Sequence, residues 1–393
     1  YKQMINITDK NQCCGCTACA SVCGHGSITM VEDAEGFKFP NIDTATCVGC
    51  GLCENVCPML HPESERSVKQ VIGAKHQDAV VRKTSSSGGV FSLLAEVFIV
   101  EGGVVVGCAM DKNLQAVHII CETIEDIIRL RSSKYVQSNV EGIFPQVRKL
   151  LRDGRKVLFS GTPCQVAGLR RFLVKPFGNL FCVDVLCHGV PSPKLFREYK
   201  EMMEQQYGSQ AHSVNFRSKK KEWKRLYINF RFDNGKEYFK NATFDPYMQL
   251  FLGNKSQRNA CFHCPFTTTN RQGDISLGDF WGIGKNFPGL DDDKGISMIL
   301  INSDKGEEMY SKIMYQITSF ESNLDQAIYG NKVLVENILG EEQRDCYYST
   351  FVADGLRVSF EKHTRYFSFW KESYIHLMRW GLDFIRYICH ISY

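Results

Sequence analysis

Two cysteine runs near the N-terminus determine what this chain folds around. Each run has the spacing C-x2-C-x2-C-x3-C, and the second is followed by Pro58. The first contains Cys13, Cys16, Cys19 and Cys23, and the second contains Cys47, Cys50, Cys53 and Cys57. This spacing is typical of paired 4Fe–4S clusters, where three thiolates of a run bind one cluster and the fourth binds its neighbour. We therefore predict two 4Fe–4S clusters in the N-terminal part of the chain.

The same rule assigns the ligands of each cluster. One cluster is expected on Cys13, Cys16, Cys19 and Cys57, and the other on Cys47, Cys50, Cys53 and Cys23. The runs are those of a bacterial ferredoxin, except that Gly24 follows the first run where proline is usual. Disulfides suit oxidising compartments, and one structural zinc would use only half of these thiolates, so clusters are favoured over both. Cys14 is out of register and is expected to be a bystander.

Length and composition bound the rest of the molecule. At 393 residues the chain is too long for one ferredoxin, and 44% hydrophobic with 23% charged residues is ordinary for a globular protein. A net charge of +4 gives no reason to expect a nucleic-acid partner. The opening YKQMINITDK lacks a signal-peptide apolar region, and no stretch approaches the ~20 apolar residues of a membrane-spanning helix. Eighteen cysteines without an export signal indicate metal ligation in the cytoplasm.

Three parts of the chain differ in texture. Residues 1–66 form the ferredoxin-like module, which ends in a polar linker. In residues 67–345, strand patterns at 71–76, 104–110, 156–160 and 179–186 alternate with helices at 88–101 (Ser-capped), 141–154, 165–173 and 193–208. This alternation predicts an α/β core with a mostly parallel sheet. Segments 213–218 and 225–240 predict an antiparallel hairpin region with DNG at its turn.

Four cysteines outside the runs stand where a third site would need them. Cys164 and Cys187 each follow a predicted strand, and Cys261 and Cys264 form a C-x2-C pair. Ligands in open α/β sheets bind beyond the carboxyl ends of strands. Four thiolates are enough for a third 4Fe–4S cluster. A zinc site, a redox-active Cys164 and ordinary buried cysteines are the alternatives.

Two further segments are candidates for binding a cofactor. TSSSGGVFSLL places Ser86, Ser87, Gly88 and Gly89 at a predicted helix N-terminus, where phosphate binds well, although serine is also a common helix cap. RSSKYVQS adds Lys134 and Tyr135, which equally suit a solvated loop. The basic run 217–225 reads as a solvated face or as a surface that attracts an acidic partner. No G-x-G-x-x-G follows a predicted strand, which argues against a Rossmann nicotinamide site.

Taken in order, these motifs resemble a known family. The two cysteine runs, SSSGGVFSLLA, SSKYVQS, GTPCQVAGLR, CHGVPSP, CFHCPF and GDISLGDFWG are similar to the coenzyme F420 hydrogenase/dehydrogenase beta-subunit family over roughly residues 10–300. That family includes beta subunits of F420-reducing hydrogenase and formate dehydrogenase, and plant 7-hydroxymethyl chlorophyll a reductase. The resemblance implies a flavin, FAD or FMN, in the core beside iron–sulfur clusters. It makes Cys164, Cys187, Cys261 and Cys264 ligands of a third cluster, and Ser86–Gly89 with Lys134 and Tyr135 flavin neighbours.

The expected function is that of an iron–sulfur flavoprotein oxidoreductase. It would pass electrons between a one-electron protein carrier, ferredoxin-like or a partner subunit, and a small two-electron substrate. That substrate is either the deazaflavin coenzyme or an organic molecule linked to surface-polysaccharide synthesis. The alternative is a non-catalytic relay subunit of a larger redox complex. The sequence assigns no catalytic residue.

The C-terminal residues 346–393 match none of these motifs. Within 366–390 the polar positions recur every three or four residues, which predicts an amphipathic helix with a broad aromatic and apolar face. Its cover would be the protein's own core, a partner subunit or a membrane surface. We expect an interaction helix, and with it a cytoplasmic protein that can lie peripherally at the inner membrane surface.

Overall fold

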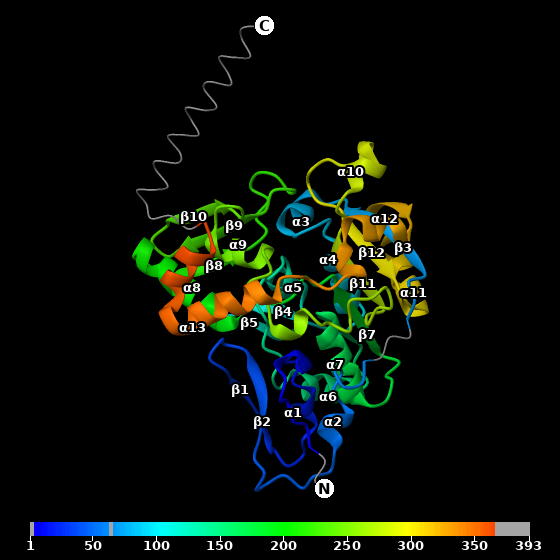
Figure 1. The fold of residues 1–393 in the computed structure, drawn as a ribbon. Coiled ribbons are helices and arrows are strands. Elements are labelled where there is room, and N and C mark those ends of the chain that lie inside the picture. Colours follow the sequence, from blue (N-terminus) through cyan, green and yellow to red (C-terminus); the bar gives the residue numbers. More distant parts are fainter. Residues whose placement is uncertain (1–3, 63–65, 366–393) are drawn as a thin grey trace.

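The computed structural model describes residues 4–62 and 66–365. The N-terminal module occupies one end of the molecule (Figure 1). It contains the short helices α1 (Ala18–Val22) and α2 (Leu52–Asn55) and an antiparallel hairpin of β1 (Ile28–Glu32) and β2 (Lys38–Ile42). The two cysteine runs lie around the two helices, so short loops hold most of the thiols. The hairpin between the runs is an element that the sequence interpretation did not include.

An eight-stranded sheet forms the centre of the larger part, in the order β13-β3-β12-β11-β7-β6-β4-β5. The inner strands β11, β7, β6 and β4 are parallel, whereas β5, β12, β3 and β13 pair antiparallel. The sheet is therefore mixed, and the expectation of a mostly parallel sheet holds only for its middle. The strands are β3 (Gln70–His76), β4 (Val104–Met110), β5 (Ala116–Cys121), β6 (Val157–Gly161), β7 (Leu180–Val185), β11 (Ile275–Asp279), β12 (Ser297–Ile301) and β13 (Ile317–Ser322).

Alternating side chains of the inner strands build a separate core on each face of the sheet. Val105, Leu158 and Phe181 pack with α4 (Val90–Val100), α5 (Ile124–Leu130) and α11 (Asp304–Ile313). Their neighbours Val106, Phe159 and Cys182 pack with α6 (Ile143–Arg152) and α7 (Pro163–Leu173) on the opposite face. Successive residues of a strand point to opposite faces. Strands that are apolar at both positions are therefore buried on both sides.

Two helix starts decide where the candidate site can lie. Helix α4 begins after Gly89, whose φ of 90° is left-handed, and no side chain caps it. The predicted serine cap is therefore wrong, because glycine takes this conformation without strain. Helix α7 has a capping box in which Thr162 and Gln165 bond each other's backbone, with proline in the first turn. It consequently starts at Pro163, two residues before the predicted helix.

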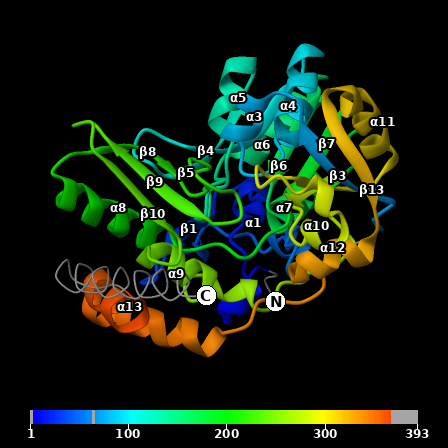
Figure 2. The same ribbon diagram turned by 90° about the horizontal axis from the view of Figure 1, so that it is seen from above.

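A second layer of structure lies beside the large sheet (Figure 2). The strands β8 (Ala211–Asn215), β9 (Tyr227–Phe232) and β10 (Glu237–Asn241) form a three-stranded antiparallel sheet. Gly235 turns the β9–β10 hairpin with a φ of 78°, as the DNG sequence predicted. An aromatic core joins this sheet to α8 (Pro193–Tyr207), α9 (Pro246–Leu252) and α13 (Glu341–His363). The remaining helices are α3 (Ala79–Thr84), α10 (Ile283–Asn286) and α12 (Leu324–Gly330).

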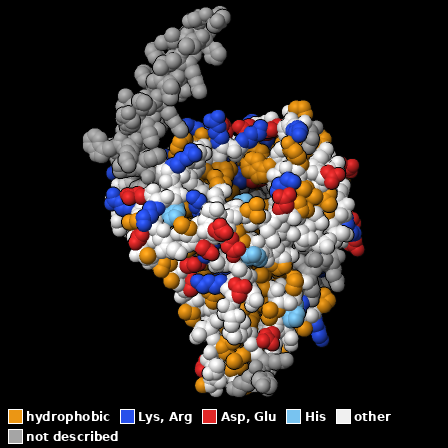
Figure 3. Space-filling model, in the orientation of Figure 1, with side chains coloured by type: hydrophobic (Ala, Val, Ile, Leu, Met, Phe, Trp, Pro, Cys, Tyr) orange, Lys and Arg blue, Asp and Glu red, His pale blue; other side chains and the backbone are white. Residues whose placement is uncertain are grey.

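The fold class is confirmed: a small ferredoxin region precedes a mixed α/β core, and a long helix, α13, lies near the C-terminal side. The domain boundaries at 66/67 and 345/346 stay predictions; α13 runs across the second. The amphipathic helix predicted at 366–390 lies outside the described residues. Within 4–62 and 66–365, no helix is both long and apolar enough to cross a membrane. The narrow end of the molecule, formed by the N-terminal module, carries exposed hydrophobic side chains (Figure 3).

Candidate redox site

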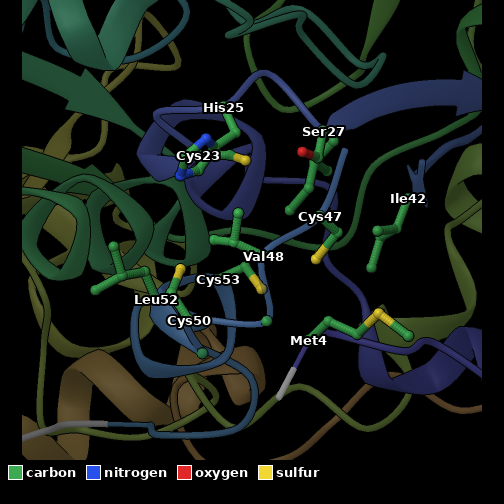
Figure 4. A pocket seen from close by; sticks show the side chains of 13 residues that line it. Met4, Cys23, His25, Ser27, Ile42, Cys47, Val48, Cys50, Leu52 and Cys53 are labelled. Carbon is green, nitrogen blue, oxygen red and sulfur yellow. The ribbon is translucent and has the colours of Figure 1, made fainter. Parts of the chain in front are cut away.

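Four of the predicted ligands meet in one pocket of the N-terminal module. Cys47, Cys50 and Cys53 of the second run line it together with Cys23 of the first (Figure 4). The loop between them turns at Gly49 and Gly51, both left-handed, which lets three thiols face one centre. The backbone N–H of Ile5 donates to the Cys53 sulfur at 3.2 Å. This is the crossed grouping that the spacing predicts.

The other four predicted ligands lie next to this pocket. Cys13, Cys16, Cys19 and Cys57 are all buried. Burial raises the pKa of Cys19 to about 12, and the nearby Cys13 and Cys57 raise it further. Among the groups that raise the Cys16 pKa are Cys19 and Cys57. Mutual influence of this kind requires short separations, so the structure brings this second set together too.

The four cysteines outside the runs line a second pocket, although 100 residues separate Cys164 from Cys264. Burial raises the pKa of Cys187 well above its usual range, and the charges of Cys261, Cys164 and Cys264 add to that effect. Burial likewise raises the pKa of Cys261 to about 12 and of Cys264 to about 11. Such thiols need a compensating positive charge before they ionise, and bound iron supplies one.

The geometry distinguishes a cluster from a single ion. Across the described ranges no three His, Cys, Asp or Glu side chains converge closely enough to share one metal ion. A 4Fe–4S cluster takes each cysteine at a different iron, so its ligands need not converge on one point. The grouping of thiols therefore fits clusters without requiring the tight geometry of a zinc site.

Cys14 lies between two of these thiol groups. It forms side-chain hydrogen bonds with Cys16 and with Cys164, and it lines the pocket of Cys164 and its partners. Because Cys14 follows Cys13 directly, it joins the N-terminal module to the core by a covalent and contact route. The expectation that Cys14 is a mere bystander overlooked this position, which its out-of-register spacing does not reveal.

A large cavity of about 670 Å³ adjoins the second pocket. Cys187, Gly189 and Val190 line both spaces. The cavity lies at the carboxyl ends of β6 and β7, where ligands of open α/β sheets bind. Its volume falls within the roughly 300–1,000 Å³ of small-molecule and cofactor sites.

The two loop motifs selected from the sequence meet at this cavity. Ser86, Ser87, Gly89, Lys134 and Tyr135 all line it. The Ser86 hydroxyl accepts a hydrogen bond from the Ser133 backbone N–H at 2.6 Å, which fastens the two motifs together. Gly88 does not line the cavity. It packs so closely against Ala74 and Ser297 that a Cβ would meet the Ala74 carbonyl oxygen at 2.3 Å.

Lys134 and Tyr135 have structural partners of their own. The Lys134 ammonium donates to the carbonyls of Arg129, Leu130 and Arg131, and so caps the end of α5. Burial lowers the Lys134 pKa to about 8. The Tyr135 ring stacks on Phe251 at 4.3 Å between ring centroids.

A buried ion pair forms another wall of the cavity. Arg217 bonds the Asp279 carboxylate at 2.6 Å and donates to the Tyr135 hydroxyl at 3.0 Å. Trp281 also lines the cavity and stacks on Trp223 at 4.6 Å. Arg217 opens the basic run, and the later lysines of that run are structurally engaged: Lys219 bonds three carbonyls, and Lys224 pairs with Asp291.

Two buried polar atoms at the cavity have no partner among the described residues. They are Nδ1 of His118 and Oδ1 of Asp279. His118 Nε2 lies 3.0 Å from the Ser160 carbonyl and must donate to it, which leaves Nδ1 as an acceptor. Burial lowers the His118 pKa to about 4. Unused acceptors in a cavity of this volume suit a polar, ring-shaped cofactor with N–H donors, so the residues fit a flavin.

The sequence interpretation missed several residues of these sites. Asp279 and Trp281 belong to GDFWG, a motif that was noted without a role for its side chains. Arg217 was hidden in the basic run. No pattern marked His118, because β5 is short and its alternation is weak.

Comparison with known proteins identifies the class first. Residues 12–60 match the 4Fe–4S dicluster domain, which confirms the predicted two-cluster module. Residues 154–324 belong to the family described as the carboxy-terminal part of the coenzyme F420 hydrogenase/dehydrogenase beta subunit. The resemblance stated from the motifs is therefore confirmed.

Individual relatives are distant. The chain is 24% identical over 217 residues to the F-type subunit of F(420)H(2) dehydrogenase from Methanosarcina mazei, and 26% identical over 198 residues to coenzyme F420-dependent sulfite reductase of Methanocaldococcus jannaschii. These matches cover 50% and 49% of this chain but only 60% and 30% of those relatives. An uncharacterised protein of the latter organism is 22% identical over 367 residues, covering 81% of this chain and 91% of its own.

A solved structure of the F420-reducing NiFe hydrogenase complex from Methanosarcina barkeri is also similar to this chain. It aligns at 19% identity with a TM-score of 0.47, and covers 71% of this chain and 90% of the solved one.

Proposed function

We propose that the protein is an iron–sulfur flavoprotein oxidoreductase. Its N-terminal module exchanges single electrons with a carrier protein, and its large cavity binds a flavin together with a small two-electron substrate. Deazaflavin coenzyme F420 is the first substrate candidate, because two relatives carry that coenzyme in their names. An organic molecule of surface-polysaccharide synthesis is the second.

One observation carries this proposal: the thiol-lined pocket and the large cavity share a wall. Cys187 belongs to both, and Cys14 connects the pocket to the cysteines of the N-terminal module. A relay subunit needs closely spaced redox centres but has no use for a cavity of about 670 Å³ lined by serines, cations and aromatic rings. The cavity therefore favours the enzyme over the relay.

Each part of the chain has a task in this scheme. Cys164, Cys187, Cys261 and Cys264 would ligate a third 4Fe–4S cluster, and the serine loops with Arg217 and Tyr135 would hold the flavin. A bound flavin supplies the change between one-electron and two-electron transfer. The protein positions it, keeps His118 neutral as an acceptor, and screens the site from water with α9 and the Trp223–Trp281 stack.

Replacement of a single ligand tests the proposal. The wild-type protein, purified without oxygen, should contain about twelve irons and one flavin per chain, because each cluster holds four irons. Cys264→Ser should lose about four irons and keep the signals of the two-cluster module, since Cys264 lies outside it. Cys346→Ser is the matched control, because that thiol is exposed and lines neither pocket. It should change neither count.

The substrate is tested with the same preparation. A flavin spectrum that dithionite bleaches and oxidised F420 restores would identify the coenzyme as a substrate, and other small acceptors are compared in parallel. Protein without flavin, or with zinc in place of the third group of irons, would contradict the proposal and favour the relay.

A further inference from the structure

Arg258 is a buried cation without a carboxylate partner. Only 1% of its surface is exposed, although it belongs to the segment that leads into Cys261. Its guanidinium donates to the carbonyls of Cys13 (2.6 Å) and Lys38 (2.9 Å) and to the side-chain oxygen of Gln137 (3.2 Å). It also lies 4.2 Å from the centre of the Phe39 ring. All of these partners are neutral.

The other buried arginines of the described ranges differ in this respect. Each of them has an acid: Arg82 pairs with Asp292, Arg217 with Asp279, Arg271 with Asp184 and Arg344 with Glu35. A guanidinium is always protonated, and a buried charge without an opposite charge is costly. The fold therefore keeps one positive charge in its interior that no protein carboxylate balances.

The position of Arg258 shows where the opposite charge belongs. Its Nη2 lies 3.4 Å from the sulfur of Cys13, a predicted ligand of the N-terminal module. The same side chain lines the pocket of Cys164, Cys187, Cys261 and Cys264. It is thus one cation set between two groups of four thiols, and each group carries net negative charge once it is ligated to iron.

We propose that Arg258 is the shared counter-charge of two iron–sulfur clusters: the one on Cys13 and its partners and the one in the core. This proposal rests on the proposed function for the core cluster, but not for the N-terminal one. Reduction adds a negative charge to a cluster, so a fixed cation close to both favours reduction of both. Arg258 also donates to a ligand sulfur, and hydrogen bonds to cluster sulfurs and local charge set the potential. Arg258 is therefore a positioning and tuning residue that couples the module to the core.

Redox titration followed by electron paramagnetic resonance tests this role. In Arg258→Met the equilibrium constant for reducing the Cys13 cluster should fall about tenfold, which is a shift of about 59 mV to more negative potential for a one-electron couple. The core cluster should move in the same direction. Arg258→Lys keeps the charge and should retain most of the wild-type potential. Release of iron to a chelator should be several-fold faster in Arg258→Met than in Arg258→Lys.

Arg148→Met is the matched control. Arg148 also lies over an aromatic ring, Phe172 at 4.5 Å, but lines neither thiol pocket. It should leave both potentials unchanged. Unchanged potentials in Arg258→Met with iron fully bound would overturn the proposal, and so would loss of the folded circular-dichroism spectrum in both Arg258 variants. Absence of flavin or of the core cluster in the wild type would contradict the proposed function, yet the Cys13 cluster would still report on Arg258.

Discussion

His118 illustrates how the interior fixes the charge of a single side chain. The ring stacks on Phe159 and is held through Nε2 at the Ser160 carbonyl. Burial is the main reason for its low pKa, and the neighbouring Lys134 lowers it further. A neutral imidazole with a free Nδ1 offers the cavity an acceptor throughout the physiological pH range.

This shift makes stability depend on pH. The folded pKa of about 4 lies below the ordinary 6.5, so between these values the unfolded chain takes up a proton that the native state excludes. Stability should therefore fall with decreasing pH, by about 1.4 kcal/mol between pH 7.5 and pH 5.5 from this residue alone. Anaerobic urea unfolding at both pH values should show a correspondingly smaller loss in His118→Gln. An equal loss in both proteins would mean that His118 ionises normally in the fold.

Single residues were predictable from the sequence to very different degrees. The ligand cysteines were identifiable because cluster chemistry fixes their spacing along the chain. Arg258 and His118 were not, because their roles depend on what surrounds them in three dimensions. Arg258 lies 245 positions from Cys13, whose sulfur it contacts, and no local pattern records such a contact.

At the scale of elements, helix α7 joins the N-terminal module to the core. It packs against α1, and Gly168 on α7 faces Cys16. A Cβ at position 168 would lie 2.9 Å from both Cβ and Sγ of Cys16. Real carbon atoms do not approach so closely, so the helix needs glycine here in order to reach a predicted cluster ligand.

Gly168→Ala should therefore act against ordinary helix propensity. Alanine in a helix interior is favoured over glycine by about 1 kcal/mol, which alone would stabilise α7. Here the added methyl group should displace Cys16 and remove about four irons, those of the cluster on Cys13, Cys16, Cys19 and Cys57. Gly24→Ala is the control, since a Cβ beside Cys23 meets nothing within 4 Å. Full iron content in both variants would show that α7 shifts easily to make room.

Elements with strong local patterns were predicted well, and those defined by pairing were not. The inner strands β4, β6 and β7 are continuous apolar runs and were found, as was the hairpin of β9 and β10. β5 and β13 were missed because they lie at the two edges of the sheet and alternate weakly. The antiparallel arrangement of β12 and β3 depends on which strands become neighbours, and a sequence pattern does not specify this.

For the whole molecule, the thiol groups and the cavity form a series. The pocket of Cys50 lies in the narrow module, the Cys13 group adjoins it, Cys14 leads to Cys164, and Cys187 borders the cavity. Cys50 is exposed at the far end of this series, whereas Cys164 and Cys187 are more enclosed. A protein carrier therefore has its shortest access to the series at the Cys50 loop.

The surface around that loop suits such an encounter. Val48 and Leu52 flank Cys50 and are 58% and 48% exposed. Electron-transfer partners bury small interfaces, below about 1,200 Å², so one or two apolar side chains make up a large share of the contact. We expect Leu52→Glu to slow reduction by a ferredoxin about tenfold while reduction by dithionite stays unchanged, because dithionite needs no docking surface. Stopped-flow absorbance under anaerobic conditions measures both rates. Val100→Glu, an equally apolar and exposed site on α4 far from the thiols, should slow neither. If both variants reacted with ferredoxin at the wild-type rate, the carrier would dock elsewhere, and electrons would have to enter the series without passing the Cys50 loop.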